Sequence, residues 1–255
     1  MGGLISPLVF PVPDRQESAS DLKSCPTLRW LQTKTAGKTP AVYFEYPGSK
    51  YVLLVTHGNA EDLGESLDSL PHLASFCNTS VFAVEYPGYS ISEATAPSEK
   101  FCYEAVEAAF EHLTTELKFP AGNVIPFGRS LGSGPAVYIA STHQDIRGLV
   151  LISPLESGAR AVIGKMTSTI GYFADPFKNY RKIGKVQAKT CIVHGTADCV
   201  VPCHNGRALY HELQKRGKAA TPLWIEGRGH NDLPESQVWQ HVKEFLIEYN
   251  FCGTT

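Results

Sequence analysis

The sequence VIPFGRSLGSGPAVYIA, residues 124–140, gives the strongest indication of the fold of this chain. At its centre the pentapeptide GRSLG, residues 128–132, matches the pattern G-x-S-x-G, in which a serine sits on a sharp turn between a strand and a helix. The residues before the pentapeptide are apolar and strand-like, and those after it are apolar and helix-like. Glycines two positions before and after Ser130 leave room for the strained backbone of such a turn. The stretch therefore predicts a serine presented at the carboxyl end of a strand; the alternative is a glycine-rich start of an ordinary helix.

Strand-like and helix-like segments alternate on both sides of this stretch. Strands are predicted at residues 28–32, 42–46, 51–56, 81–84, 123–127, 149–153, 191–194 and 223–225. Helices are predicted at residues 61–76 with an interruption at Pro71, after the N-cap Ser98, and at residues 130–142, 205–214 and 235–249. A turn of Gly, Lys, Thr and Pro separates the first two strands and indicates an antiparallel start. The later alternation indicates βαβ units, so the predicted fold class is α/β, with a mostly parallel central sheet covered by helices on both faces.

The chain is predicted to form one domain, residues 27–255, preceded by an N-terminal arm, residues 1–26. A length of 255 residues with 43% hydrophobic residues suits a single α/β core. Within the arm, residues 1–13 are apolar but broken by prolines, and residues 14–24 are interpreted as a polar connector. Residues 154–185 interrupt the alternation, and we expect them over the edge of the sheet, where they are a candidate lid.

Composition and charge exclude several classes of protein. The formal net charge of -2 argues against a protein that binds nucleic acid through a basic face. No apolar run reaches the roughly 18 residues that a membrane-spanning helix needs. Seven cysteines, an odd number spread thinly over the chain, do not form a disulfide framework, so we expect a reducing, cytosolic compartment.

A serine hydroxyl becomes a good nucleophile only when a base removes its proton, so a histidine and a carboxylate are expected downstream. His230 lies in GRGHND, residues 227–232, after the last predicted strand and before the last predicted helix. Asp198 follows the preceding strand. Both positions fall at the carboxyl ends of strands, and their order after Ser130 is the order expected for this kind of elbow. The predicted catalytic residues are therefore Ser130, Asp198 and His230.

Three other residues compete for these roles. His194 is the alternative base, but its position at the end of a strand favours packing in the core or at the rim. Glu156, which follows the predicted strand at residues 149–153, is the alternative acid. Asp232 is too close to His230 in the sequence to be its natural partner.

The negative charge that develops on the attacked carbonyl oxygen requires backbone donors. The amide of Leu131, directly after the nucleophile, is one predicted donor. The loop after the third predicted strand reads HGNA, and the amide of Asn59 is the second predicted donor, with Gly58 allowing the turn. We expect His57 to order this loop and the tyrosines of EYPGY, residues 85–89, to shape the rim of the site.

A zinc site is the alternative raised by Cys199, Cys203 and His204. No second pair of ligands stands at metal spacing elsewhere in the sequence. Hydrolysis by a serine, a histidine and an aspartate requires neither a metal nor an organic cofactor. We therefore predict no metal and no cofactor.

The start of the chain carries a lipidation pattern. MGGLIS places Gly2 first after removal of Met1, and Ser6 stands where the N-myristoylation pattern requires it. A single myristoyl chain holds a protein only marginally at a membrane, so the apolar side chains of residues 4–10 are expected to add a second attachment. We therefore expect a peripheral protein on the cytoplasmic face of membranes. The alternative is an arm packed on its own domain, in the cytosol.

Several segments together resemble the α/β-hydrolase domain-containing 17 family of serine hydrolases, which act as protein depalmitoylases. They are HGNA with DLG (57–64), GRSLG (128–132), SPL with SG (153–158), HGT with Asp198 (194–198), and PLWIEG with GHND (222–232). The likeness spans roughly residues 28–250 and includes stretches without catalytic residues, so it is more specific than the elbow alone. It implies an α/β-hydrolase fold and carries the catalytic roles to Ser130, Asp198 and His230.

The resemblance also implies a substrate. S-palmitoylated proteins are the expected substrates, cleaved at the thioester through an acyl-enzyme intermediate, and we expect the enzyme to be a monomer. Animal members of the family carry an N-terminal cysteine cluster that is itself palmitoylated, whereas this chain has only Cys25 in that region and offers Gly2 instead. The residues alone leave two alternatives open: a general carboxylesterase or lipase, and a non-catalytic scaffold that binds acyl groups.

Overall fold

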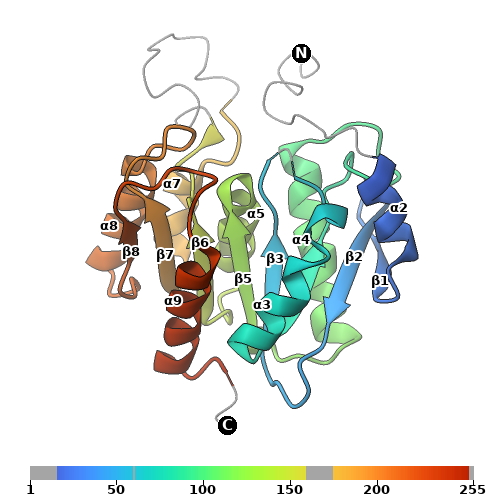
Figure 1. The fold of residues 1–255 in the computed structure, drawn as a ribbon, viewed down its shortest axis with the longest axis horizontal. Coiled ribbons are helices and arrows are strands. Elements are labelled where there is room, and N and C mark those ends of the chain that lie inside the picture. The colour runs from blue at the N-terminus through green and yellow to red at the C-terminus, as the bar shows by residue number, and fades with distance from the viewer. Residues whose placement is uncertain (1–15, 60, 159–174, 253–255) are drawn as a thin grey trace.

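The computed structural model describes residues 16–59, 61–158 and 175–252, which form an α/β fold around an eight-stranded sheet (Figure 1). The strands are β1 (Leu28–Gln32), β2 (Lys38–Phe44), β3 (Val52–Thr56), β4 (Ser80–Val84), β5 (Val124–Arg129), β6 (Gly148–Ile152), β7 (Lys189–Gly195) and β8 (Leu223–Ile225). Their order across the sheet is β1-β2-β4-β3-β5-β6-β7-β8. β2 pairs antiparallel with β1 and with β4, and the other pairings of this sheet are parallel. The predicted fold class and the antiparallel start are confirmed.

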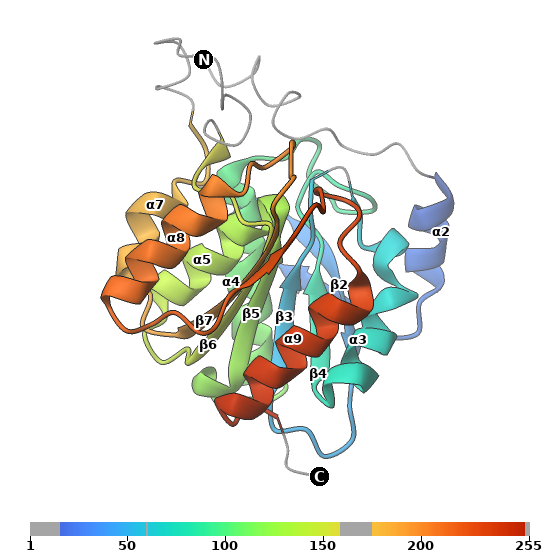
Figure 2. The same ribbon diagram turned by 60° about the vertical axis from the view of Figure 1, so that its left-hand side comes forward.

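Helices cover both faces of the sheet (Figure 2). They are α2 (Gln16–Ser24), α3 (Ser69–Cys77), α4 (Glu99–Thr115), α5 (Ser133–Thr142), α7 (Asn179–Lys182), α8 (His204–Lys215) and α9 (Glu235–Glu248). Short 3-10 turns lie at Gly64–Ser66, Ala121–Asn123, Ser130–Gly132 and Ile183–Lys185. Helices α4, α5 and α8 supply one apolar layer of the core, and α2, α3 and α9 supply the other. The sheet is thus held between two layers, which fixes where its strands end.

The central strands are buried on both faces. Every residue of β3, β4 and β6 is buried, as parallel strands beneath two layers of helices must be.

Ser98 caps α4 as predicted, because its hydroxyl accepts a hydrogen bond of 3.1 Å from the amide of Phe101. Helix α9 buries Val238, Val242 and two further apolar residues toward the sheet. The candidate site lies at the carboxyl ends of the central strands.

The interpretation of residues 14–24 as a polar connector is wrong, because Gln16–Ser24 form helix α2. Leu22 is fully buried in the same apolar layer as α3 and α9. The hydroxyl of Ser18 donates a hydrogen bond of 2.6 Å to Oδ2 of Asp62. A short polar helix owes its stability to tertiary contacts of this kind, which the local sequence does not display.

Two other predicted segments differ from the structure by more than three residues at one end. Residues 38–40, expected in the first turn, already belong to β2, so the turn lies before them. Residues 61–76 form no continuous helix; the 3-10 turn at Gly64–Ser66 is followed by α3, which begins at Ser69. Pro71 lies in the first turn of α3, where a missing N–H breaks no hydrogen bond and no kink follows.

Two predictions concern segments outside the described residues. Gly2 and the rest of residues 1–15 are among them, so the arm and its lipidation stay predictions. Residues 159–174, the middle of the candidate lid 154–185, are also outside. Within the described ranges, every helix is too short or too polar to cross a lipid bilayer.

Candidate active site

Ser130 lies at the turn between β5 and the 3-10 turn that leads into α5. Its φ of 53° falls in the left-handed region, which residues other than glycine adopt where the surrounding structure imposes it. The backbone of the turn lies close against β3, because a Cβ on Gly132 would overlap the carbonyl oxygens of Thr56 and His57. The Thr56 hydroxyl also donates a hydrogen bond of 2.8 Å to the Gly132 carbonyl. The pentapeptide therefore has the strand–turn–helix geometry expected from the sequence.

Three side chains from distant parts of the chain meet at this turn. Nε2 of His230 lies 2.9 Å from Oγ of Ser130, and Nδ1 of His230 lies 2.7 Å from Oδ2 of Asp198. Asp198 follows β7, and His230 lies between β8 and α9. All three residues are buried. The structure thus brings together the three residues predicted to be catalytic, connected in the order Ser–His–Asp.

The surroundings of Asp198 favour its charged form. Its Oδ1 accepts hydrogen bonds of 2.9 and 2.8 Å from the amides of Val200 and Val201. Nε2 of His194 lies 3.3 Å from Oδ2. Burial by itself raises the pKa of Asp198, but the hydrogen bonds from His194 and His230 outweigh burial and keep the pKa well below its ordinary value. A carboxylate ionised in this way can orient the imidazole and stabilise its protonated form.

The competing residues take other places. His194 is fully buried, and its Nε2 lies 2.8 Å from the Val201 carbonyl, so its ring supports the loop that carries Asp198. The backbone amide of Glu156 donates to Oδ1 of Asn205. Asp232 accepts a hydrogen bond of 2.5 Å from the Gly229 amide and so shapes the loop around His230. In the part of the chain that the structure describes, no three His, Cys, Asp or Glu side chains are grouped as a metal site requires.

The loop after β3 is anchored by a buried ion pair. Nε2 of His57 lies 2.7 Å from Oε1 of Glu85, and Nδ1 of His57 lies 2.8 Å from the Gly58 carbonyl. Burial by itself lowers the pKa of His57, but the Glu85 carboxylate outweighs burial, so the pKa lies above its ordinary value. The other oxygen of Glu85 accepts a hydrogen bond from the Leu63 amide. These contacts agree with the expectation that His57 orders this loop.

The two tyrosines of residues 85–89 were expected to shape the rim of the site. They instead lie buried beneath the loop. The hydroxyl of Tyr86 donates to the His57 carbonyl at 2.7 Å. The hydroxyl of Tyr89 donates to Oδ1 of Asn59 at 3.0 Å. The side chain of Asn59 is thereby held in place, while its backbone amide and that of Leu131 stay the predicted oxyanion donors.

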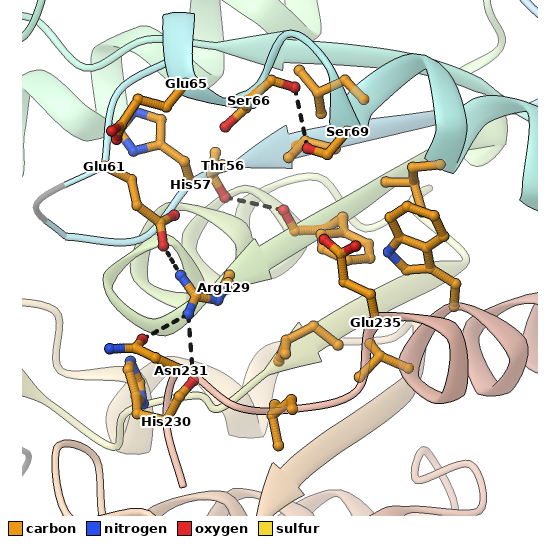
Figure 3. Close-up of a pocket in the computed structure, with 18 residues that line it drawn as sticks. Thr56, His57, Glu61, Glu65, Ser66, Ser69, Arg129, His230, Asn231 and Glu235 are labelled. Atoms are coloured by element: carbon orange, nitrogen blue, oxygen red, sulfur yellow. Dashed lines mark hydrogen bonds and ion pairs between the residues drawn. The ribbon is translucent and has the colours of Figure 1, made fainter.

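Arg129, the residue before the serine, contacts two other loops (Figure 3). Its Nη1 pairs with Oε1 of Glu61. Its Nη2 donates to the His230 carbonyl at 3.3 Å and to Oδ1 of Asn231 at 3.0 Å. Glu61 in turn accepts a hydrogen bond of 2.9 Å from the Gly58 amide. Neither Arg129 nor Glu61 was predicted to belong to the site, although one signal was available: Arg129 is a charged residue beside the nucleophile in an otherwise apolar stretch.

A cavity of about 400 Å³ lies beside His230, on the face of the sheet covered by α3 and α9 (Figure 3). Thr56, Arg129 and His230 are among the residues that line it. Apolar side chains make up much of the remaining wall: Val55, Leu70, Leu73, Phe127, Ile152, Leu233, Val238 and Trp239. A cavity of this size and lining is typical of sites for small organic groups.

Comparison with known proteins agrees with the fold. The sequence profile of the family described as alpha/beta hydrolase fold matches residues 51–181, and that of the prolyl oligopeptidase family matches residues 165–252. An esterase from Pyrococcus furiosus superposes with a TM-score of 0.69 at 16% identity, covering 93% of this chain and 97% of that chain. The butyrate-bound esterase Est2 from Thermogutta terrifontis gives a TM-score of 0.71 at 14% identity, covering 90% and 97%. The protein is therefore an α/β hydrolase.

Two relatives narrow this class. Alpha/beta hydrolase domain-containing protein 17C of Xenopus laevis is 35% identical over 235 residues, which are 91% of this chain and 73% of that protein. Alpha/beta hydrolase domain-containing protein 17B of Homo sapiens is 37% identical over 203 residues, which are 79% of this chain and 68% of that protein. The chain belongs to the α/β-hydrolase domain-containing protein 17 family.

Proposed function

We propose that this protein is a serine hydrolase that releases fatty acids from S-acylated cysteines of other proteins. The observation that carries the proposal is the chain of contacts from Ser130 Oγ through His230 to Asp198, at 2.9 and 2.7 Å, on an elbow of the expected geometry. Geometry of this kind is the signature of an activated serine on many unrelated folds.

The proposed reaction has two halves. His230, oriented by Asp198, accepts the proton of Ser130 as its oxygen attacks the carbonyl carbon of the thioester. The amides of Leu131 and Asn59 donate to the oxyanion, the carbon–sulfur bond breaks, and His230 returns the proton to the cysteine sulfur. Water then gives its proton to His230 and attacks the acyl-enzyme. His230 passes that proton to the departing Ser130 oxygen, and the fatty acid is released.

Two observations support an acyl thioester as substrate. The chain is similar over 91% of its length to alpha/beta hydrolase domain-containing protein 17C of Xenopus laevis, and its resemblance to this family implies protein depalmitoylation. The apolar cavity beside His230 offers surface against which an acyl chain can be buried. We further propose that myristoylation at Gly2 keeps the enzyme on the cytoplasmic face of membranes, where such substrates lie. Intact-mass measurement after expression with N-myristoyltransferase tests this part, and a mass without the acyl group contradicts it.

Hydrolysis of a fluorogenic palmitoyl-cysteine peptide tests the proposed reaction. Ser130→Ala is expected to abolish turnover while the thermal unfolding curve stays close to that of the wild type, and the matched variant Ser141→Ala is expected to retain activity. Activity that survives Ser130→Ala would refute the assignment of the nucleophile. p-Nitrophenyl esters of rising chain length, assayed beside the peptide, distinguish a general carboxylesterase. A folded wild type that no fluorophosphonate labels would indicate a non-catalytic scaffold.

A further inference from the structure

The guanidinium group of Arg129 lies where three loops of the site come together (Figure 3). Arg129 is the last residue of β5 and directly precedes the nucleophile Ser130. One of its nitrogens pairs with Glu61, which follows the loop of the predicted oxyanion donor Asn59. Its other terminal nitrogen donates to the carbonyl of His230 and to Oδ1 of Asn231, on the loop of the base. These loops are far apart in the sequence: Arg129 and His230 are separated by 101 residues.

The contact with the Asn59 loop includes a backbone group, the amide of Gly58. Glu61 receives the amide proton of Gly58 at 2.9 Å through one carboxylate oxygen while the other oxygen pairs with Arg129. A Cβ at Gly58 would stand 3.1 Å from Nη1 of Arg129 and 3.0 Å from Oε2 of Glu61, so a side chain at this position would press on the ion pair. The hydrogen bond from its amide thus links Gly58, and Asn59 next to it, to the ion pair.

We propose that Arg129 is a positioning residue that holds the nucleophile, the base and the oxyanion loop in register with one another. This inference rests on the proposed function only in requiring that Ser130 is the nucleophile. A planar guanidinium can serve two directions at once, whereas an ammonium is a point charge on a flexible stem. Arg129 acts on the geometry of the reaction rather than on substrate binding. A displacement of about 1 Å in such a site can lower the rate about 100-fold.

The test compares Arg129→Ala and Arg129→Lys with Arg228→Ala, which removes the same charge from the half-exposed side chain that pairs with Asp232 in the His230 loop. With p-nitrophenyl butyrate, we expect kcat to fall about 100-fold in Arg129→Ala and about 10-fold in Arg129→Lys, with KM within about threefold of the wild type. Arg228→Ala is expected to keep wild-type kcat. Guanidinium at about 50 mM is expected to raise the kcat of Arg129→Ala at least about fivefold, because it can occupy the vacated position. No such rise is expected in the other variants.

Three outcomes overturn the proposal. They are a kcat of Arg129→Ala within threefold of the wild type, a loss that appears in KM alone, or an equal loss in Arg228→Ala. If Arg129→Ala does not fold, Glu61→Gln and Asn231→Ala each remove one contact of the guanidinium; wild-type kcat in both overturns the proposal, and a fall of about 10-fold in each supports it.

Fluorophosphonate labelling separates this inference from the proposed function. A wild type that is not labelled contradicts the proposed function. A labelled wild type with an equally fast Arg129→Ala contradicts the positioning role alone.

Discussion

The carboxylate of Glu85 lies 2.7 Å from Nε2 of His57, and both side chains are buried beneath the loop that leads to Asn59. The second nitrogen of the imidazole faces the Gly58 carbonyl, so a ring protonated on both nitrogens satisfies both acceptors. A charged pair in this position ties the end of β3 to the segment after β4. The loop proposed to carry an oxyanion donor is thus held by two contacts, one of Glu85 with His57 and one of Arg129 with Glu61.

Glu85→Gln is expected to destabilise the protein by about 3–5 kcal/mol, because it leaves the His57 charge buried without a counter-charge. Urea unfolding at neutral pH, followed by circular dichroism, measures the free energy of unfolding. Glu93→Gln is the control and should lose far less, because the Glu93 carboxylate accepts its hydrogen bond from the exposed amide of Lys38. Equal losses in the two variants would contradict a special role of the buried pair.

The same pair predicts a pH dependence of stability. The pKa of His57 lies above its ordinary value of 6.5 in the folded protein, so the folded state binds this proton more tightly than the unfolded state does. The contribution is therefore fully present below pH 6.5 and is lost as the pH rises through the folded-state pKa. The difference in unfolding free energy between the wild type and Glu85→Gln should shrink from pH 6 toward pH 9. Urea titrations across this range of about three pH units measure the difference. If it stays constant, His57 does not gain a proton on folding.

Gly132→Ala tests the packing of the elbow against β3. The added methyl group would overlap the carbonyl oxygens of Thr56 and His57, so the turn must move. We expect a loss of about 1–3 kcal/mol in the free energy of unfolding together with a large fall in the rate of fluorophosphonate labelling. Gly184→Ala is the matched control, since nothing lies within 4 Å of its added Cβ. Normal labelling of a stable Gly132→Ala would show that the close approach is not needed.

Those parts of the fold whose signal lies in consecutive residues were predictable. The strands Leu28–Gln32 and Leu223–Ile225 have the predicted bounds, because their β-prone runs end at residues that favour turns. The elbow was predictable for the same reason, since strand, glycines and helix follow one another within residues 124–140. His230 and Asp198 could be placed because parallel strands bring their carboxyl ends to one edge of the sheet.

Those features that depend on a distant partner were not predictable. Helix α2 is stabilised by Ser18 on Asp62 and by the burial of Leu22, and neither contact leaves a trace in the local pattern. The roles of Glu85 and Arg129 were missed in the same way, because their partners lie 28 and 101 residues away. Charged residues in apolar surroundings mark such positions, but a single sequence does not name the partner that neutralises them.

The cavity beside His230 predicts how acyl chain length affects the rate. Val238 is buried on α9 and lines the apolar wall, so Val238→Phe places additional carbon atoms inside the cavity. If the acyl chain of the substrate lies there, kcat/KM for a palmitoyl ester should fall at least about 10-fold, since burial of each CH₂ group contributes about 0.8 kcal/mol. The rate for an acetyl ester should stay near that of the wild type, because a short chain does not reach the altered wall.

The control for this prediction is Ile247→Phe, which adds the same side chain to the same helix at a position 55% exposed to solvent. It should leave the whole chain-length profile unchanged. A loss that is equal for acetyl and palmitoyl esters in Val238→Phe would indicate a disturbed His230 loop rather than a filled cavity. An unchanged profile in a folded Val238→Phe would mean that the acyl chain binds elsewhere, and the apolar wall between α3 and α9 would then have no part in substrate selection.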